Sequence, residues 1–232
     1  MKYNEKILQN FHDFVKKEKD SAYKQLKQFF DDEKRKYYDD RILELQESGL
    51  SDEDSIVKAR QGWVSVVGTS LEKIIECLIS DFCKKNNLKI TNDKKLKAEK
   101  LSGELDLIKR LLLVHYDEYS VLPDGDIIVY KTGANPKILA ILSIKNSFRE
   151  RYTETPYWKI KLSQSKITKH IKVFMITPDK DDEISFVKNI KKSRIVMEYE
   201  LDGIYLAKND FDSSNKVKGI ENLIIDLEKL LK

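Results

Sequence analysis

The chain has 232 residues, of which 41% are hydrophobic and 35% charged, which suits one domain or one domain with an appended helical arm. With 43 Lys and Arg against 39 Asp and Glu, the net charge of +4 gives only weak support for nucleic-acid binding. The sequence contains no run of about 18 apolar residues and no apolar core of the signal-peptide type. Cys77 and Cys83 lie on one expected helix and point to different faces, so we expect reduced thiols and a cytoplasmic protein.

The first 60 residues are polar and have the apolar spacing of helices. Aromatic residues recur at helical intervals between Phe11 and Phe30, and Ser51 followed by three acids is typical of a helix start. We therefore expect an N-terminal helical region over residues 1–60 and a second domain over residues 61–232.

A core helix is predicted next, because a wide apolar stripe at helical spacing runs from Gly68 to about Lys85. From Pro123 onward the pattern changes to that of a sheet, beginning with the turn sequence Pro123-Asp124-Gly125. In chain order we expect a loop with a short helix over 86–103, a helix over 104–115, strands over 126–130 and 138–145, a helix over 149–162, strands over 172–177, 194–198 and 203–207, and a helix over 217–231. This order predicts an α/β (α+β) fold with a central mixed β-sheet flanked by helices.

The residues that carry chemistry stand at the ends of the two strands that form the predicted hairpin. Lys145 ends a strongly apolar strand and shares a face with Ser143, because side chains alternate along a strand. A lysine there needs an anion, which Asp124 or Asp126 at the start of the partner strand supplies. A carboxylate and a lysine at adjacent strand ends can hold a divalent cation and orient a water.

This arrangement resembles the PD-(D/E)XK nuclease superfamily, specifically its type II restriction endonucleases, over roughly residues 60–180. Arg149-Glu150-Arg151 follows Lys145 at the offset of the Lys-x-x-x-Arg-(Asp/Glu)-Arg motif of enzymes that read CCGG and CCNGG sites. Arginine forks match guanine O6 and N7, and a carboxylate accepts from cytosine N4, each good pair giving roughly 1–3 kcal/mol of discrimination. The resemblance implies that these three residues recognise DNA bases.

The resemblance also implies a catalytic set, which consists of Glu72, Asp124, Asp126, Ser143 and Lys145. Glu72, four residues after Gly68, resembles the upstream acidic position of these nucleases. The implied cofactor is Mg²⁺, held by Glu72 with Asp124 or Asp126. Ser143 stands where the superfamily often has an acid, so Glu72 or Glu154 must replace that acid, and the number of metals stays open.

The implied function is that of a type II restriction endonuclease that makes Mg²⁺-dependent double-strand cuts at a short GC-containing palindrome with CC and GG steps. A palindromic site implies a homodimer, with residues 1–60 as a dimerisation or DNA-contact arm. A cognate DNA methyltransferase is expected as a genetic companion rather than as a bound partner.

Two alternatives stay open. One is another PD-(D/E)XK nuclease, a repair or structure-specific enzyme, in which Arg149 and Arg151 contact phosphates. The other is a non-catalytic DNA-binding protein with a degenerate nuclease fold, which Ser143 favours.

Overall fold

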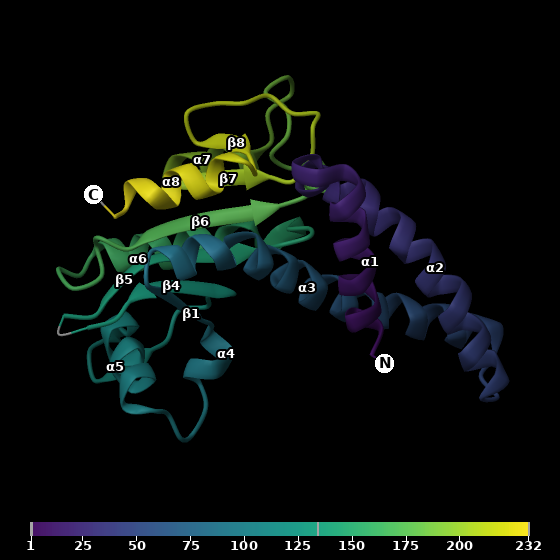
Figure 1. Ribbon diagram of the computed structural model, residues 1–232, viewed down its shortest axis with the longest axis horizontal. Coiled ribbons are helices and arrows are strands. Elements are labelled where there is room, and N and C mark those ends of the chain that lie inside the picture. Colours follow the sequence, from purple (N-terminus) through teal and green to yellow (C-terminus); the bar gives the residue numbers. More distant parts are fainter. Residues whose placement is uncertain (1, 134, 232) are drawn as a thin grey trace.

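The computed structural model describes residues 2–133 and 135–231, without the side chains of Asp20, Arg149 and Glu150. The chain starts with the helical elements α1 (Tyr3–Glu18), η1 (Lys19–Gln25, a 3-10 helix) and α2 (Leu26–Glu47). Figure 1 shows α1 and α2 at one end of the molecule, beyond the sheet. The predicted helical character of this region is confirmed.

Helix α3 (Asp52–Lys85) connects this helical region to the sheet (Figure 1). Ser51 caps the helix by accepting a hydrogen bond from the backbone N–H of Asp54, and three acids in the first turn interact favourably with the helix dipole. The helix start predicted at Gly68 is therefore wrong, because buried residues at helical spacing continue upstream of it to Ala59.

The N-terminal helices share a hydrophobic core with the sheet. Phe30 of α2 and Trp63 of α3 belong to the same buried cluster as Val129, which lies in a central strand. The boundary expected between residues 60 and 61 falls inside α3. The division of the chain into an arm and a nuclease domain stays a prediction.

A six-stranded mixed sheet forms the centre of the fold, in the order β1-β4-β5-β6-β7-β8. The strands are β1 (Leu88–Thr91), β4 (Ile127–Lys131), β5 (Lys137–Ile144), β6 (Lys172–Thr177), β7 (Gly203–Leu206) and β8 (Val217–Gly219). The pairs β1–β4 and β4–β5 are antiparallel, whereas β5 to β8 are parallel to one another. Because both faces of the central strands are buried, their sequences are continuous apolar runs rather than alternating ones.

Helices cover both faces of this sheet, which confirms the predicted α/β fold class. The core cluster on one face includes α3 and α8 (Asn222–Lys229), and the cluster on the other face includes α5 (Gly103–Leu112), α6 (Glu154–Ser163) and α7 (Lys192–Glu200). The remaining elements are α4 (Asp93–Leu96), the β2–β3 hairpin (Val114–Tyr116 and Tyr119–Val121) and η2 (Arg149–Thr153). No helix within residues 2–133 or 135–231 is both long and apolar enough to cross a membrane.

Several predicted elements differ from the structure, because β1 lies in the loop expected over residues 86–103 and the helix expected over residues 104–115 ends at Leu112, before β2. The strand expected over residues 194–198 is wrong, because this segment lies in α7, where Arg194 and Met197 are buried at helical spacing and Ile195 is 52% exposed. The helix expected over residues 217–231 begins only at Asn222, because residues 217–219 add β8 to the edge of the sheet.

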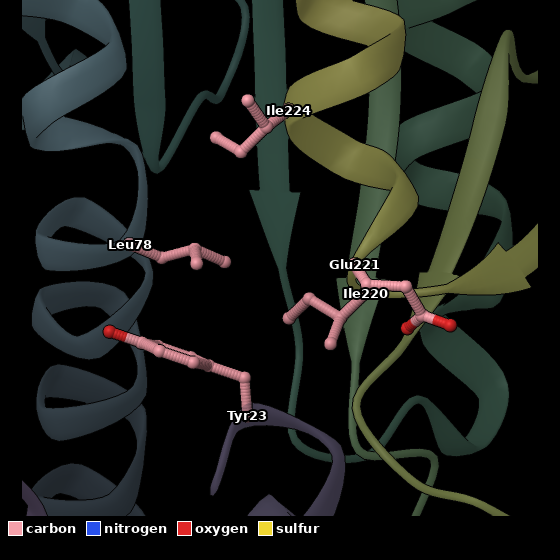
Figure 2. A pocket seen from close by; sticks show the side chains of 5 residues that line it. All are labelled: Tyr23, Leu78, Ile220, Glu221 and Ile224. Atoms are coloured by element: carbon pink, nitrogen blue, oxygen red, sulfur yellow. The ribbon is translucent and has the colours of Figure 1, made fainter. Parts of the chain in front are cut away.

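Contacts between distant parts of the chain attach the helical region to the C-terminal segment. Tyr23 of η1 and Leu78 of α3 line a hollow of about 280 Å³ together with Ile220 and Ile224 (Figure 2). Beside this hollow, the Lys24 Nζ lies 3.0 Å from a carboxylate oxygen of Glu221. The N-terminal helices are thereby held against the last helix and strand.

Asp202, just before β7, ties α6 to the sheet. Its carboxylate lies 2.6 Å from the Lys159 Nζ and accepts from the Lys172 Nζ at 2.9 Å and the Val173 backbone N–H at 2.9 Å. Burial raises the pKa of Asp202, but the hydrogen bonds from Lys159, Val173 and Lys172 outweigh this effect and leave the pKa below its usual range. Lys159 is therefore engaged in a structural ion pair.

Asp202→Asn is expected to destabilise the fold by about 3–5 kcal/mol at neutral pH, because it leaves the Lys159 ammonium, 14% exposed, without its anion. A lowered folded-state pKa contributes stability above the unfolded value of about 3.9, and this stability is lost as the pH falls below it. The difference in the free energy of unfolding between wild type and variant should therefore shrink as urea unfolding is measured from pH 6 to below about 4. A difference that stays constant with pH would contradict this role of Asp202.

Candidate active site

Lys145 directly follows β5, at the edge where the parallel strands end. Its backbone N–H donates to the carbonyl of Ile176 in β6 at 3.1 Å, which fixes the main chain at this point. Its Nζ lies 3.7 Å from the Oδ2 of Asp126, and the two side chains are 29% and 17% exposed. The half-buried lysine thus has the anionic neighbour that its position requires.

Asp126 is held beside Lys145 by the pairing of β4 with β5. Ile127 lies opposite Leu142 in this antiparallel pair, so the residue before β4 lies next to the last residues of β5. The backbone N–H of Ile144 donates to the Asp126 Oδ2 at 2.7 Å. Among the described residues, no group donates a hydrogen bond to Oδ1.

Glu72 of α3 lies within electrostatic reach of both residues. Burial and, next, the negative charge of Asp126 raise the pKa of Glu72, while the ammonium groups of Lys94 and Lys145 act in the opposite direction. The Lys94 Nζ donates to both carboxylate oxygens of Glu72 at 3.3 Å. The structure therefore brings together Glu72, Asp126 and Lys145.

This donor set fits a hard divalent cation. Burial and, next, the charge of Asp126 raise the pKa of Glu72, and a bound cation would stabilise both carboxylates in their charged form. Within residues 2–133 and 135–231 there is no group of three or more His, Cys, Asp and Glu side chains that could hold a metal ion. Two carboxylates suffice for a magnesium-like ion, which keeps several waters and takes its other ligands from substrate phosphates.

Asp124 and Ser143 lie in other surroundings. Asp124 is exposed, with one carboxylate oxygen 3.1 Å from the Lys97 Nζ and the other accepting from the Trp158 indole N–H at 3.4 Å. The hydroxyl of Ser143 is buried and forms a 2.9 Å hydrogen bond with Thr155 on α6. Of the two candidate aspartates, the geometry thus favours Asp126 as the partner of Lys145.

The segment expected to read bases begins with a 3-10 helix instead of an α-helix. Arg149, Glu150 and Arg151 lie in η2, which precedes α6. The side chains of Arg149 and Glu150 lie outside the described part of the chain, so their recognition role stays a prediction. Arg151 is exposed and lines a cleft next to Lys145.

That cleft contains further residues that the sequence did not mark as functional. It has a volume of about 350 Å³ and is lined by α2, α3, the end of β5 and the loop after β6. Lys34, Arg60 and Lys180 line it together with Lys145. These residues are far apart in the sequence, and no motif connects them, so only the folded chain brings them together.

Comparisons with known proteins identify the family of this chain. The family model described as "BsaWI restriction endonuclease type 2" matches residues 104–226, which include Asp126 and Lys145. A "Probable type II restriction enzyme", HpyAORF263P of Helicobacter pylori, is 58% identical over 78% of this chain and 92% of its own length. MjaVIP of Methanocaldococcus jannaschii, also provisionally named a type II restriction enzyme, is 46% identical over 86% of this chain and 90% of its own.

A crystal structure of a pre-specific complex of the restriction endonuclease BsaWI with DNA aligns with all of this chain and 94% of its own, at 10% identity and a TM-score of 0.43. The family match covers more than half of the chain, and the first relative is similar over more than two thirds of it. This chain therefore belongs to the BsaWI family of type II restriction endonucleases.

Proposed function

We propose that this restriction endonuclease cuts both strands of duplex DNA at a short GC-containing palindrome with CC and GG steps, using Mg²⁺. The observation that carries the proposal is the pair formed by Asp126 and Lys145 at the carboxyl edge of the sheet, with Glu72 of α3 close enough for its carboxylate to interact with both charges. Two carboxylates and a lysine are the groups that metal-assisted phosphodiester hydrolysis requires.

In this reaction a water attacks the phosphorus, and the bond from phosphorus to the 3′ oxygen breaks, leaving a 5′-phosphate and a 3′-hydroxyl. When bound, Mg²⁺ stabilises the charge that develops at the phosphorus and lowers the pKa of water. Asp126, through its Oδ1, and Glu72 would hold the ion. The ammonium of Lys145, kept in place by the Asp126 Oδ2, orients the water and stabilises negative charge on the phosphate oxygens.

The recognition part of the proposal rests on the position of η2, which starts only four residues after Lys145. A base-recognition segment this close to Lys145 would couple recognition of the DNA sequence to cleavage. A palindrome is read by two copies of this segment related by two-fold symmetry, so we propose a homodimer as the active form. A cognate DNA methyltransferase belongs to the proposed system genetically and not as a bound subunit.

Arg149→Ala is expected to weaken binding to the recognition site by about 5- to 150-fold, the equivalent of roughly 1–3 kcal/mol for a bidentate contact with guanine. Binding to unrelated DNA should change little. Fluorescence anisotropy in Ca²⁺, with labelled specific and unrelated duplexes, measures both affinities. Lys169→Ala, an exposed cation beyond α6, is the control. An equal loss of affinity on both duplexes would assign Arg149 to phosphate contact and favour the alternative nuclease.

The test of the proposed function is cleavage of a plasmid of known sequence in Mg²⁺, followed by mapping of the ends. Discrete cuts at one repeated palindrome are the expected result. Random nicking would support a nuclease without base recognition. Intact plasmid, with binding to DNA retained, would support a non-catalytic DNA-binding protein, the alternative that Ser143 at the acid position favours.

A further inference from the structure

The cleft beside Lys145 is strongly basic, although the chain as a whole is nearly neutral. Besides Lys145, the cations that line it are Lys34, Arg60, Arg151 and Lys180, and the one acid in its lining is Asp181. Among the described residues, neither Lys34 nor Arg60 has a carboxylate oxygen within 4.0 Å. Lys145 and Lys180 have acidic neighbours in Asp126 and Asp31, so the positive charge that no protein carboxylate pairs with is that of Lys34 and Arg60.

The position of the cleft is that of a ligand site. In open α/β sheets, ligands bind in the crevice outside the carboxyl ends of the strands. The loops that follow β5 and β6 form one side of the cleft, with Asn146 and Lys180. Helices α2 and α3 form the other side, and Figure 1 shows the arrowhead of β6 directed toward this helical region. A ligand in the cleft would therefore touch both the catalytic edge and the N-terminal helices.

Gly68 is the second observation that points to a ligand. It lies in the interior of α3 and lines the cleft, yet an added Cβ would meet no protein atom within 4 Å. Glycine in a helix interior is less stable than alanine, so packing within the protein does not explain it. Gly62 in the same helix differs, because a Cβ there would collide with the Tyr37 hydroxyl.

Gly68 lies one helical turn before Glu72, so both residues point to the same side of α3. A DNA strand that lies in the cleft beside Lys145 therefore passes next to Gly68 on the side of α3 that carries Glu72. Glycine is the residue that lets a backbone approach a helix closely. The missing side chain, the unpaired cations and the adjoining catalytic edge all fit one occupant, a polyanionic strand.

We propose that the sugar-phosphate backbone of the bound DNA strand runs through this cleft in close contact with Gly68, while Lys34 of α2 and Arg60 near the start of α3 contact its phosphates. This inference rests on the proposed function and gives the N-terminal helices a role in DNA binding. Lys34 and Arg60 are positioning residues in this role, because they fix the strand and do not touch the reacting atoms.

The first test uses the double variant Lys34→Ala/Arg60→Ala and a fluorescein-labelled duplex of three helical turns, roughly 30 base pairs. Each lost phosphate contact reduces the salt dependence, so the plot of log K against log salt from roughly 50 to 200 mM should become shallower by about 1–2. Lys58→Ala is the matched control, since Lys58 is exposed on α3 but does not line the cleft. The control should keep the slope of the wild type.

The second test uses Gly68→Ala, which separates a binding defect from a folding defect. Its melting temperature should rise by about 1–4 °C, because alanine stabilises the helix. Its affinity for the same duplex should nevertheless fall by about fivefold or more, because the methyl group occupies space used by the DNA strand. Ser65→Ala, at an exposed position of α3 outside the cleft lining, should bind like the wild type.

An unchanged salt slope in the double variant, or unchanged affinity in Gly68→Ala, would overturn the proposed strand path. Plasmid cleavage by the wild type from the same preparation distinguishes this failure from that of the proposed function. Discrete cuts with unchanged binding by the variants would reject the strand path alone. A wild type that cuts no DNA would reject the nuclease proposal, and the slopes would still decide whether nucleic acid occupies the cleft.

Discussion

Asp126→Asn is expected to abolish DNA cleavage, whereas Asp124→Asn should leave the enzyme active. The Asp126 carboxylate is the one that lies beside Lys145 and raises the pKa of Glu72. Asparagine still accepts a hydrogen bond from the Ile144 backbone N–H, so the strand ends keep their places. It lacks the negative charge that holds a divalent cation, which contributes several kcal/mol to catalysis. Cleavage should therefore slow by roughly a thousandfold or more.

The matched variant at Asp124 loses only an exposed ion pair with Lys97 and a long hydrogen bond from Trp158. Exposed pairs of this kind contribute about 0–1 kcal/mol to stability, so folding and cleavage should both remain close to wild type. Single-turnover cleavage of a plasmid in excess enzyme compares the two variants directly. The reverse result, with Asp124→Asn inactive and Asp126→Asn active, would refute the assignment.

The sequence predicted that Lys145 lies at the end of a strand, and it limited the aspartate partner of Lys145 to Asp124 or Asp126. Both predictions were possible because the turn and the apolar runs of the hairpin are local patterns. The sequence did not distinguish Asp124 from Asp126, because that choice depends on the backbone around Gly125. This residue is buried, and a Cβ there would lie 3.0 Å from the Ile141 Cγ2, so the chain passes tightly over β5. The next residue is thereby directed to the Ile144 N–H.

Other differences between the predicted elements and the structure also arise from contacts between separate segments of the chain. Residues 194–198 have the β-branched composition of a strand, yet they form a helix because Arg194 is buried and donates to the carbonyls of Ile184, Ser185 and Asp212. Strand β1 has only four residues, one of them a lysine, and is stabilised by its pairing with β4. These partners are distant in the sequence, so no local pattern reveals them.

The basic cleft likewise forms only in the folded chain, from residues that are far apart in the sequence. Each of its cations is unremarkable in a chain that is 35% charged. The cations come together because α2 and α3 pack near the carboxyl edge of the sheet. The sequence predicted residues 1–60 as a separate helical region and did not indicate where these helices lie relative to the sheet. Local patterns thus predicted the position of Lys145 at the end of a strand, and the tertiary structure added the surface around it.

Lys145→Ala is expected to lower the rate of cleavage by roughly a thousandfold while changing the affinity for DNA by only a few fold. The reason is that one ammonium among the several that line the cleft contributes little to binding, whereas its place next to Asp126 is unique among the described residues. Removing the half-buried cation also leaves the negative charges of Asp126 and Glu72 less compensated, which strengthens their attraction for a divalent cation, so the variant should reach half of its residual activity at a lower Mg²⁺ concentration.

Cleavage rates at several Mg²⁺ concentrations, together with anisotropy titrations in Ca²⁺, separate the two effects. Lys58→Ala serves again as the control for the loss of one positive charge on the protein. A Lys145→Ala enzyme that binds weakly but cuts normally at saturating concentration would make Lys145 a phosphate contact and not a catalytic group. In that case the chemistry would depend on Glu72 and Asp126 alone, and the lysine at the end of β5 would belong functionally with Lys34 and Arg60 across the cleft.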